Sequence, residues 1–305
     1  MPSANPAFNN PAFQDQSAVR SYPGGAQAAN IGGSSQNAAF AQQAQAASVN
    51  AHLEGQFAAP SAGAVETDRM TVEDTVWKTV GLFGILVVTA VVGWFWSMST
   101  VTAASPTPTM IPWIVGLAGG FILAMVISFS KTVRPPLIFA YAALEGLFIG
   151  SISAFFEIIW PGIVLQATLG TLSVVGVTLA LFASGKIRAS KRATKIWMIA
   201  MIGYLVFSLI NVGMMMFGAF PADSGGAFGM LSNVQVFGIP LGLIIGVFVV
   251  IMAAYSLVQD FDFIQQGVRN RAPRKYGWLG GFGIMVTVVW LYIEILRIIA
   301  IARSN

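Results

Sequence analysis

The sequence predicts an all-α, polytopic membrane protein with seven transmembrane helices. Hydrophobic residues make up 56% of the 305 residues and charged residues only 9%, whereas soluble domains have about 25% charged residues. Several segments of about 20 residues have few or no charges, and this length crosses the hydrocarbon core of a bilayer. A membrane β-barrel would instead show alternating segments of about 10 residues.

The first 68 residues have a different composition from the rest of the chain. They are rich in Ala, Gln, Asn, Ser and Gly and contain almost no Leu, Ile or Val. Such a segment buries too little apolar area to offset its conformational entropy. We therefore expect residues 1–68 to be a disordered cytoplasmic tail and residues 69–305 to be the membrane domain. The chain begins with no basic n-region and apolar core, so we expect no signal peptide.

Seven apolar segments follow, separated by stretches that contain Pro or Gly. Thr71 is the expected N-cap of the first helix, because Glu73 and Asp74 in its first turn favour the helix dipole. The expected spans are Trp77–Met98, Ile111–Ser130, Leu137–Glu157, Gly162–Ser184, Ile196–Phe220, Val236–Gln259 and Leu279–Ala302.

Basic residues between the spans predict the orientation. The loops after the second, fourth and sixth spans carry eleven Lys and Arg residues, and the other three loops carry none. Cytoplasmic loops are enriched in these residues. We therefore expect a plasma-membrane protein with a cytoplasmic N-terminus and its C-terminus on the outer side. The same rule, together with contact with anionic lipids, explains the basic run Lys186–Lys195.

Glycines spaced four apart predict close contacts between helices. In membranes such spacing lets two helix backbones approach each other. The glycines are Gly116 and Gly120, Gly146 and Gly150, and Gly238, Gly242 and Gly246.

Acidic residues at membrane depth are the candidate functional groups. Glu294 lies within the apolar stretch Val286–Ala302. A carboxylate there costs about 2.5–3.5 kcal/mol on translocon scales, so it normally faces the protein interior. Asp260 and Asp262 follow the apolar run of the sixth span, and Glu145 lies about two turns into the third.

Three arrangements of Glu294 are open. It pairs with Arg297 at i+3 on its own helix, or it is a buried neutral acid, or it faces Asp260 or Asp262 and shares a proton with it. The third arrangement would act as a pH switch. The deprotonated carboxylate oxygens of such a pair suit Ca²⁺, and the expected ligands are Asp262 and Glu294. Arg134 is either the counter-charge that closes this site or a residue that only sets topology.

Other functional classes find little support. The chain has no cysteine, which excludes disulfides and thiolate metal sites. It has no nucleophile, phosphate-binding or metalloprotease motif, so we expect neither catalysis nor a bound cofactor. The basic residues lie in loops between apolar runs, so we expect no nucleic-acid partner.

Two regions of the chain resemble the Bax inhibitor-1/YccA family, and more closely its actinobacterial-type branch. They are Leu257–Ile264 with Gly267-Val268 and Ala272-Pro273, and Val289–Arg297. The segment Leu144–Ser151 is similar to an early glycine motif of the family. The resemblance covers about residues 70–305.

The resemblance implies seven helices with the last one central. In bacterial members it also implies a pH-sensitive Ca²⁺ leak, gated by a carboxylate pair on the last two helices. By motif, Glu294 takes the last-helix position, where Asp is more usual. Asp260 or Asp262 takes the sixth-helix position, and Asp262 fits slightly better. Arg134 takes the position of an arginine latch.

We therefore expect a calcium-permeable leak channel or transporter. The alternative is a non-transporting regulator that binds other membrane proteins, such as a membrane protease, through its long tail. A third possibility is a structural membrane protein whose acids only satisfy one another.

Overall fold

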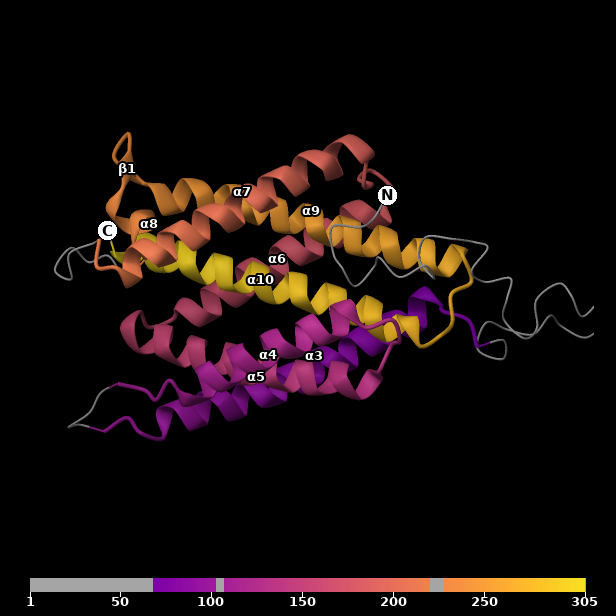
Figure 1. Cartoon of the computed structure of the whole chain (residues 1–305), viewed down its shortest axis with the longest axis horizontal. Helices are drawn as coiled ribbons and strands as arrows, with labels where there is room; N and C mark the ends of the chain where they lie inside the picture. The colour runs from indigo at the N-terminus through magenta and orange to yellow at the C-terminus, as the bar shows by residue number, and fades with distance from the viewer. Residues whose placement is uncertain (1–67, 103–106, 220–227, 305) are drawn as a thin grey trace, which may run out of the picture.

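The computed structural model describes residues 68–102, 107–219 and 228–304 (Figure 1). Within these ranges, seven helices are long and apolar enough to cross a membrane, which confirms the predicted fold class. They are α3 (Val72–Met98), α4 (Ile111–Phe129), α5 (Pro135–Ile159), α6 (Ile163–Ala183), α7 (Lys191–Met216), α9 (Leu241–Arg269) and α10 (Tyr276–Ser304). The expected disorder of residues 1–67 and the expected end of the fifth span at Phe220 lie outside the described residues.

Local signals fix where the first helix begins. The Thr71 side chain accepts a hydrogen bond of 3.0 Å from the backbone N–H of Asp74, so the predicted N-cap is confirmed. Such a cap satisfies one of the N–H groups that the first helical turn leaves without a partner.

The sixth span begins later than predicted, at Leu241 instead of Val236. Before it lie the short helix α8 (Met230–Asn233) and a hairpin of β1 (Gln235–Val236) and β2 (Ile239–Pro240). Phe237 and Gly238 form the hairpin turn with φ of 55° and 79°, a conformation typical of two-residue turns. Gly238 therefore belongs to a turn, and the prediction that it packs within the helical glycine series was wrong.

The same helix ends ten residues later than predicted. It continues past Gln259 to Arg269, because Ile264 and Gly267 still bury one face of it against the bundle. Asp260 and Asp262 are consequently helical residues and not residues at a helix end.

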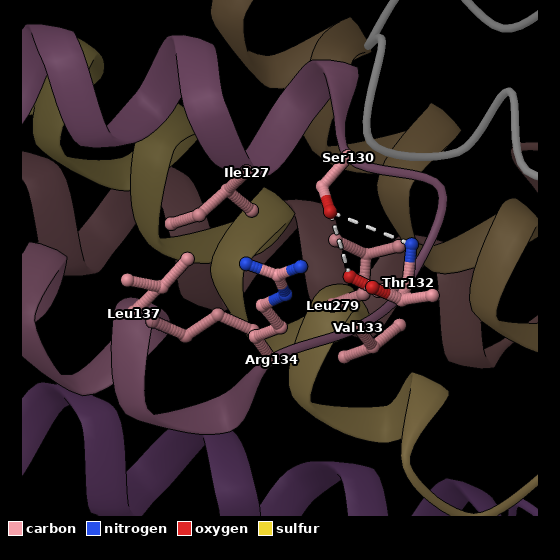
Figure 2. Close-up of a pocket in the computed structure, with 8 residues that line it drawn as sticks. Ile127, Ser130, Thr132, Val133, Arg134, Leu137 and Leu279 are labelled. Atoms are coloured by element: carbon pink, nitrogen blue, oxygen red, sulfur yellow. Dashed lines mark hydrogen bonds between the residues drawn. The ribbon is translucent and has the colours of Figure 1, made fainter.

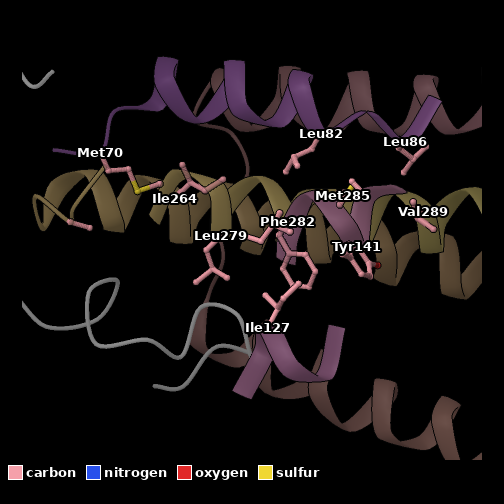
Figure 3. Close-up of a cluster of buried hydrophobic side chains, with 13 residues drawn as sticks. Met70, Leu82, Leu86, Ile127, Tyr141, Ile264, Leu279, Phe282, Met285 and Val289 are labelled. Carbon is pink, nitrogen blue, oxygen red and sulfur yellow. The ribbon is translucent and has the colours of Figure 1, made fainter. Parts of the chain in front are cut away.

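Helix α10 lies in the middle of the bundle (Figure 1). It packs against α9, α3, α6 and α5, while α5 lies against both α3 and α4. A hydrophobic cluster joins α3, α5 and α10, in which Leu82, Tyr141, Phe282 and Met285 are buried (Figure 3). The Tyr141 and Phe282 rings meet edge to face with centroids 4.9 Å apart. The predicted central position of the last helix is confirmed.

Most of the predicted glycine contacts are confirmed. A Cβ atom on Gly116 would lie 2.6 Å from the Phe148 amide nitrogen, so α4 and α5 touch through their backbones. Gly146 and Gly150 lie in the same way against the backbone of α3. Gly242 approaches the Leu231 carbonyl oxygen, where an added Cβ atom would be only 2.7 Å away.

One end of the bundle holds the three basic loops α4–α5, α6–α7 and α9–α10, and we call it the basic end. Here the start of α3 is tied to the loop before α10. The Met70 N–H donates to the Ala272 carbonyl at 2.7 Å, and Arg274 donates to Asp74 Oδ1 at 3.0 and 2.8 Å. Hydrogen bonding to the Asp74 carboxylate raises the pKa of Arg274. These contacts join the start of α3 to the α9–α10 loop.

Candidate intramembrane polar site

Glu294 lies in the interior of the bundle, on the central helix α10, with 2% of its surface exposed. Its Oε1 atom forms an ion pair with the guanidinium of Arg297, one helical turn away. Its Oε2 atom accepts a hydrogen bond of 3.2 Å from the Tyr204 hydroxyl of α7. Arg297 also donates to the Tyr204 oxygen at 2.8 Å. We call these three residues the Glu294 cluster.

The Glu294 cluster is compensated in charge. The buried carboxylate of Glu294 and the half-buried guanidinium of Arg297 together carry no net charge, and the guanidinium donates to the carboxylate. Of the three arrangements open from the sequence, the local pair with Arg297 is the one in the structure. One hydrogen-bond donor of the cluster is not satisfied, because the buried Arg297 Nε has no partner among the described residues.

Asp260 forms a second buried acidic position, on α9. It has no exposed surface, and its Oδ2 atom accepts a hydrogen bond of 2.6 Å from the Thr287 hydroxyl of α10. The neighbouring Gln259 is 3% exposed, and its amide oxygen and nitrogen have no hydrogen-bond partner among the described residues. Polar groups buried in this way usually bind ordered water.

The two buried acids occupy different levels of α10. Thr287, which binds Asp260, precedes Glu294 by seven residues, and this is two helical turns or about 10 Å along the axis. The structure therefore does not bring Asp260 and Glu294 together as one carboxylate pair. It places them at two levels along the central helix α10, and we call these two residues the column of buried acids.

Asp262 lies two residues further toward the basic end and is half-buried. Residues two apart on a helix point in different directions, so Asp262 does not share the Asp260 position against Thr287.

Arg134 lies at the start of α5 and is exposed. It lines a hollow of about 270 Å³, including its open mouth, whose walls are Ile127, Ile138 and Leu279 (Figure 2). The ion pairs seen among the described residues join Asp74 to Lys78 and Arg274, and Glu294 to Arg297. A latch of Arg134 onto Asp260 or Asp262 stays a prediction.

Two acids on α5 have local roles. Glu145 is half-buried and interacts with the Tyr141 hydroxyl one turn earlier. Its Oε2 atom lies near Gly120 of α4, where a Cβ atom would be 3.1 Å away. Glu157 accepts hydrogen bonds from the N–H groups of Gly162 at 2.6 Å and Val164 at 3.1 Å, and so caps the start of α6.

The described residues do not assemble a resident metal site. Among them, no three His, Asp or Glu side chains lie close enough together to hold a metal ion. Ca²⁺ takes six to eight oxygen ligands, and the predicted ligands Asp262 and Glu294 lie on different helices at different levels.

Sequence reasoning missed Tyr204 and Thr287, the partners of the two buried acids. Each is a polar residue in an otherwise apolar span, and that is the signal that could have marked them. Which acid each one meets depends on how the helices rotate against each other.

The comparison with protein families gives one result. A family model described as "Bax inhibitor 1 like" matches residues 5–304. The match covers nearly the whole chain, and it extends into the tail, beyond the region where the resemblance was seen. Neither the curated proteins nor the solved structures gave a match. The chain, whose described part holds seven long apolar helices with Glu294 on the central one, belongs to the Bax inhibitor 1-like family of membrane proteins.

Proposed function

We propose that this protein is a pH-sensitive, calcium-permeable leak channel or transporter of the plasma membrane. In this proposal the N-terminus and the basic end face the cytoplasm, and the C-terminus lies on the outer side. The observation that carries the proposal is the column of buried acids on α9 and α10. Intramembrane acids that face the interior of a bundle commonly mark ion or proton paths.

The column offers oxygen ligands at successive depths. Glu294 is the deeper level from the basic end, and Asp260 lies about two turns closer to that end. Asp262 is half-buried one step nearer that end, on a different side of α9. A partly hydrated Ca²⁺ ion moves along such steps when each one binds it only weakly. The amide of Gln259, which has no hydrogen-bond partner among the described residues, adds a polar group next to Asp260.

Glu294 and Arg297 form the gate in this proposal. While Glu294 is ionised, it cancels the charge of Arg297. When Glu294 takes up a proton, the guanidinium is left uncompensated and repels a cation. The leak therefore decreases as the pH falls. Arg134 closes the cytoplasmic end when its side chain moves onto Asp260 or Asp262.

Calcium flux in reconstituted vesicles tests the gate. We expect wild-type flux to rise between pH 6 and pH 8, and we expect Glu294→Gln to remove this dependence because the side chain no longer titrates. Glu73→Gln is the matched control: it removes one carboxylate from an exposed position at the start of α3, and its flux should follow wild type. Equal flux and an equal pH profile in wild type and Glu294→Gln would exclude the mechanism.

The second candidate is a non-transporting regulator that binds a membrane protease or another membrane protein. The observation that favours it is the exposure of α7: within this helix, which the structure describes in full, only Asn211 is buried. A large apolar helix face can dock another membrane protein as well as lipid. The same flux assay separates the two functions, because a regulator gives no flux above empty vesicles at any pH.

A further inference from the structure

The junction between α6 and α7 carries a dense group of basic residues. Five of them fall within ten positions, and all five are exposed: Lys186, Arg188, Lys191, Arg192 and Lys195. The segment 184–195 contains no acid. The ion pairs within the described ranges involve Lys78, Arg274 and Arg297, so none neutralises this group.

One member of the group is held in a fixed position. Arg188 donates a hydrogen bond of 2.9 Å to Gln265 of α9, and its guanidinium lies 4.2 Å from the centre of the Phe182 ring. The junction is therefore attached to the end of α9. This leaves Lys191, Arg192 and Lys195, in the first turns of α7, directed to the surroundings of the protein.

An apolar surface continues directly from these three residues along α7. Ile196, Ile199 and Ile202 are 68%, 64% and 57% exposed. Residues three and four apart share a helix face, so Arg192, Lys195, Ile199 and Ile202 form one continuous strip. The strip is cationic at the basic end and apolar toward the membrane centre. This matches a phospholipid with an anionic headgroup and acyl chains.

We propose that this strip of α7 is a binding surface for anionic phospholipid. The phosphate lies against Lys191, Arg192 and Lys195, and an acyl chain lies along Ile196, Ile199 and Ile202. Basic side chains at a membrane surface attract anionic lipids, and long Lys and Arg side chains reach the headgroup level from a helix end. The proposal does not depend on calcium transport.

The other side of α7 faces the protein. Near the start of the helix, Trp197 donates to the Met252 carbonyl at 2.8 Å, and Tyr255 bonds with Thr194 at 3.0 Å. Further along, α7 supplies the Tyr204 hydroxyl to the Glu294 cluster. The exposed strip is therefore not used by these contacts, and it is free to bind lipid in this proposal.

The α9–α10 loop provides a matched control. Its residues Arg269, Arg271 and Lys275 are exposed at the same end of the bundle. Neutralising these three removes the same total charge as neutralising Lys191, Arg192 and Lys195. The three loop residues precede Gly277 and Leu279, which are buried, so no exposed apolar strip continues from them. If basic residues only set the topology of the chain, neutralising either group of three should have the same effect on lipid binding.

Native mass spectrometry of the full chain in mixed phosphatidylglycerol and phosphatidylcholine tests the proposal. We expect Lys191→Gln/Arg192→Gln/Lys195→Gln to weaken phosphatidylglycerol binding at least about tenfold. Arg269→Gln/Arg271→Gln/Lys275→Gln should change it less than about twofold. Lys191→Arg/Lys195→Arg keeps the charges and should retain binding, which separates lost binding from lost folding.

Two outcomes would overturn the proposal. Equal losses in both neutralised triplets, or a loss in neither, would show that the strip has no special affinity for anionic lipid. Unchanged lipid binding with an altered oligomeric mass in the same spectra would assign the surface to contacts between copies of this chain.

Discussion

Replacing Arg297 by glutamine is expected to destabilise the folded protein by about 3–5 kcal/mol. The change removes the charge that compensates Glu294, which is 2% exposed on the central helix. It also removes the donor that fixes the Tyr204 hydroxyl. The remaining carboxylate is then buried without a counter-charge, and this is far more costly than the loss of an exposed pair. Unfolding in mixed micelles at constant pH measures the effect.

Two further variants show whether the cost arises from the unpaired charge. Glu294→Gln/Arg297→Gln removes both charges and should regain much of the lost stability. Arg303→Gln removes an exposed arginine of the same helix, which among the described residues bonds to the Pro161 carbonyl and Gln166, and should cost about 1 kcal/mol or less. If Arg297→Gln has the same free energy of unfolding as wild type, the ion pair does not stabilise the folded protein.

Replacing Gly150 by alanine is expected to separate α3 from α5 and to cost about 3 kcal/mol, the upper end of the range for overpacking. The new Cβ atom would overlap the Ala90 carbonyl oxygen and lie 2.6 Å from the Ala90 carbonyl carbon. These are backbone atoms of α3, so no side-chain rotation relieves the overlap. Thermal unfolding of the purified variant measures the loss.

Gly84→Ala is the matched control for Gly150→Ala. Gly84 lies on α3, and a Cβ atom there has nothing within 4 Å. The substitution should be neutral or stabilise the protein by about 0.5–1 kcal/mol, because alanine loses less conformational freedom in a helix. Similar unfolding temperatures for both alanine variants would contradict the close approach of α3 and α5.

The sequence alone was sufficient to predict the number of membrane spans and most of the close contacts between them. Long apolar segments and Pro or Gly breakers are properties of the chain alone, and they located all seven helices. The positions of Gly116, Gly146 and Gly150 predicted contacts between helices, because a glycine has no side chain and the backbone of a neighbouring helix can approach it closely. The hairpin at Phe237-Gly238 was missed because residues 236–240 are mostly apolar and were taken as the start of the next span.

The partners of the acids were only partly accessible to sequence reasoning. The Glu294–Arg297 pair follows from i+3 spacing on one helix, and it was among the alternatives considered. The Tyr204 and Thr287 contacts join different helices. They depend on the rotation and vertical position of each helix, which are set by packing over the whole bundle. The same dependence explains why Asp260 and Glu294 lie at separate levels.

Infrared difference spectroscopy tests most directly whether Glu294 is the acid that changes protonation. Spectra of the reconstituted protein at pH 8 and pH 6 report the conversion of carboxylate into protonated carboxyl groups. We expect a protonated-carboxyl band in the wild-type difference spectrum that is absent from that of Glu294→Gln. Identical difference spectra for the two proteins would show that Glu294 does not titrate in this range and would contradict the proposed gate.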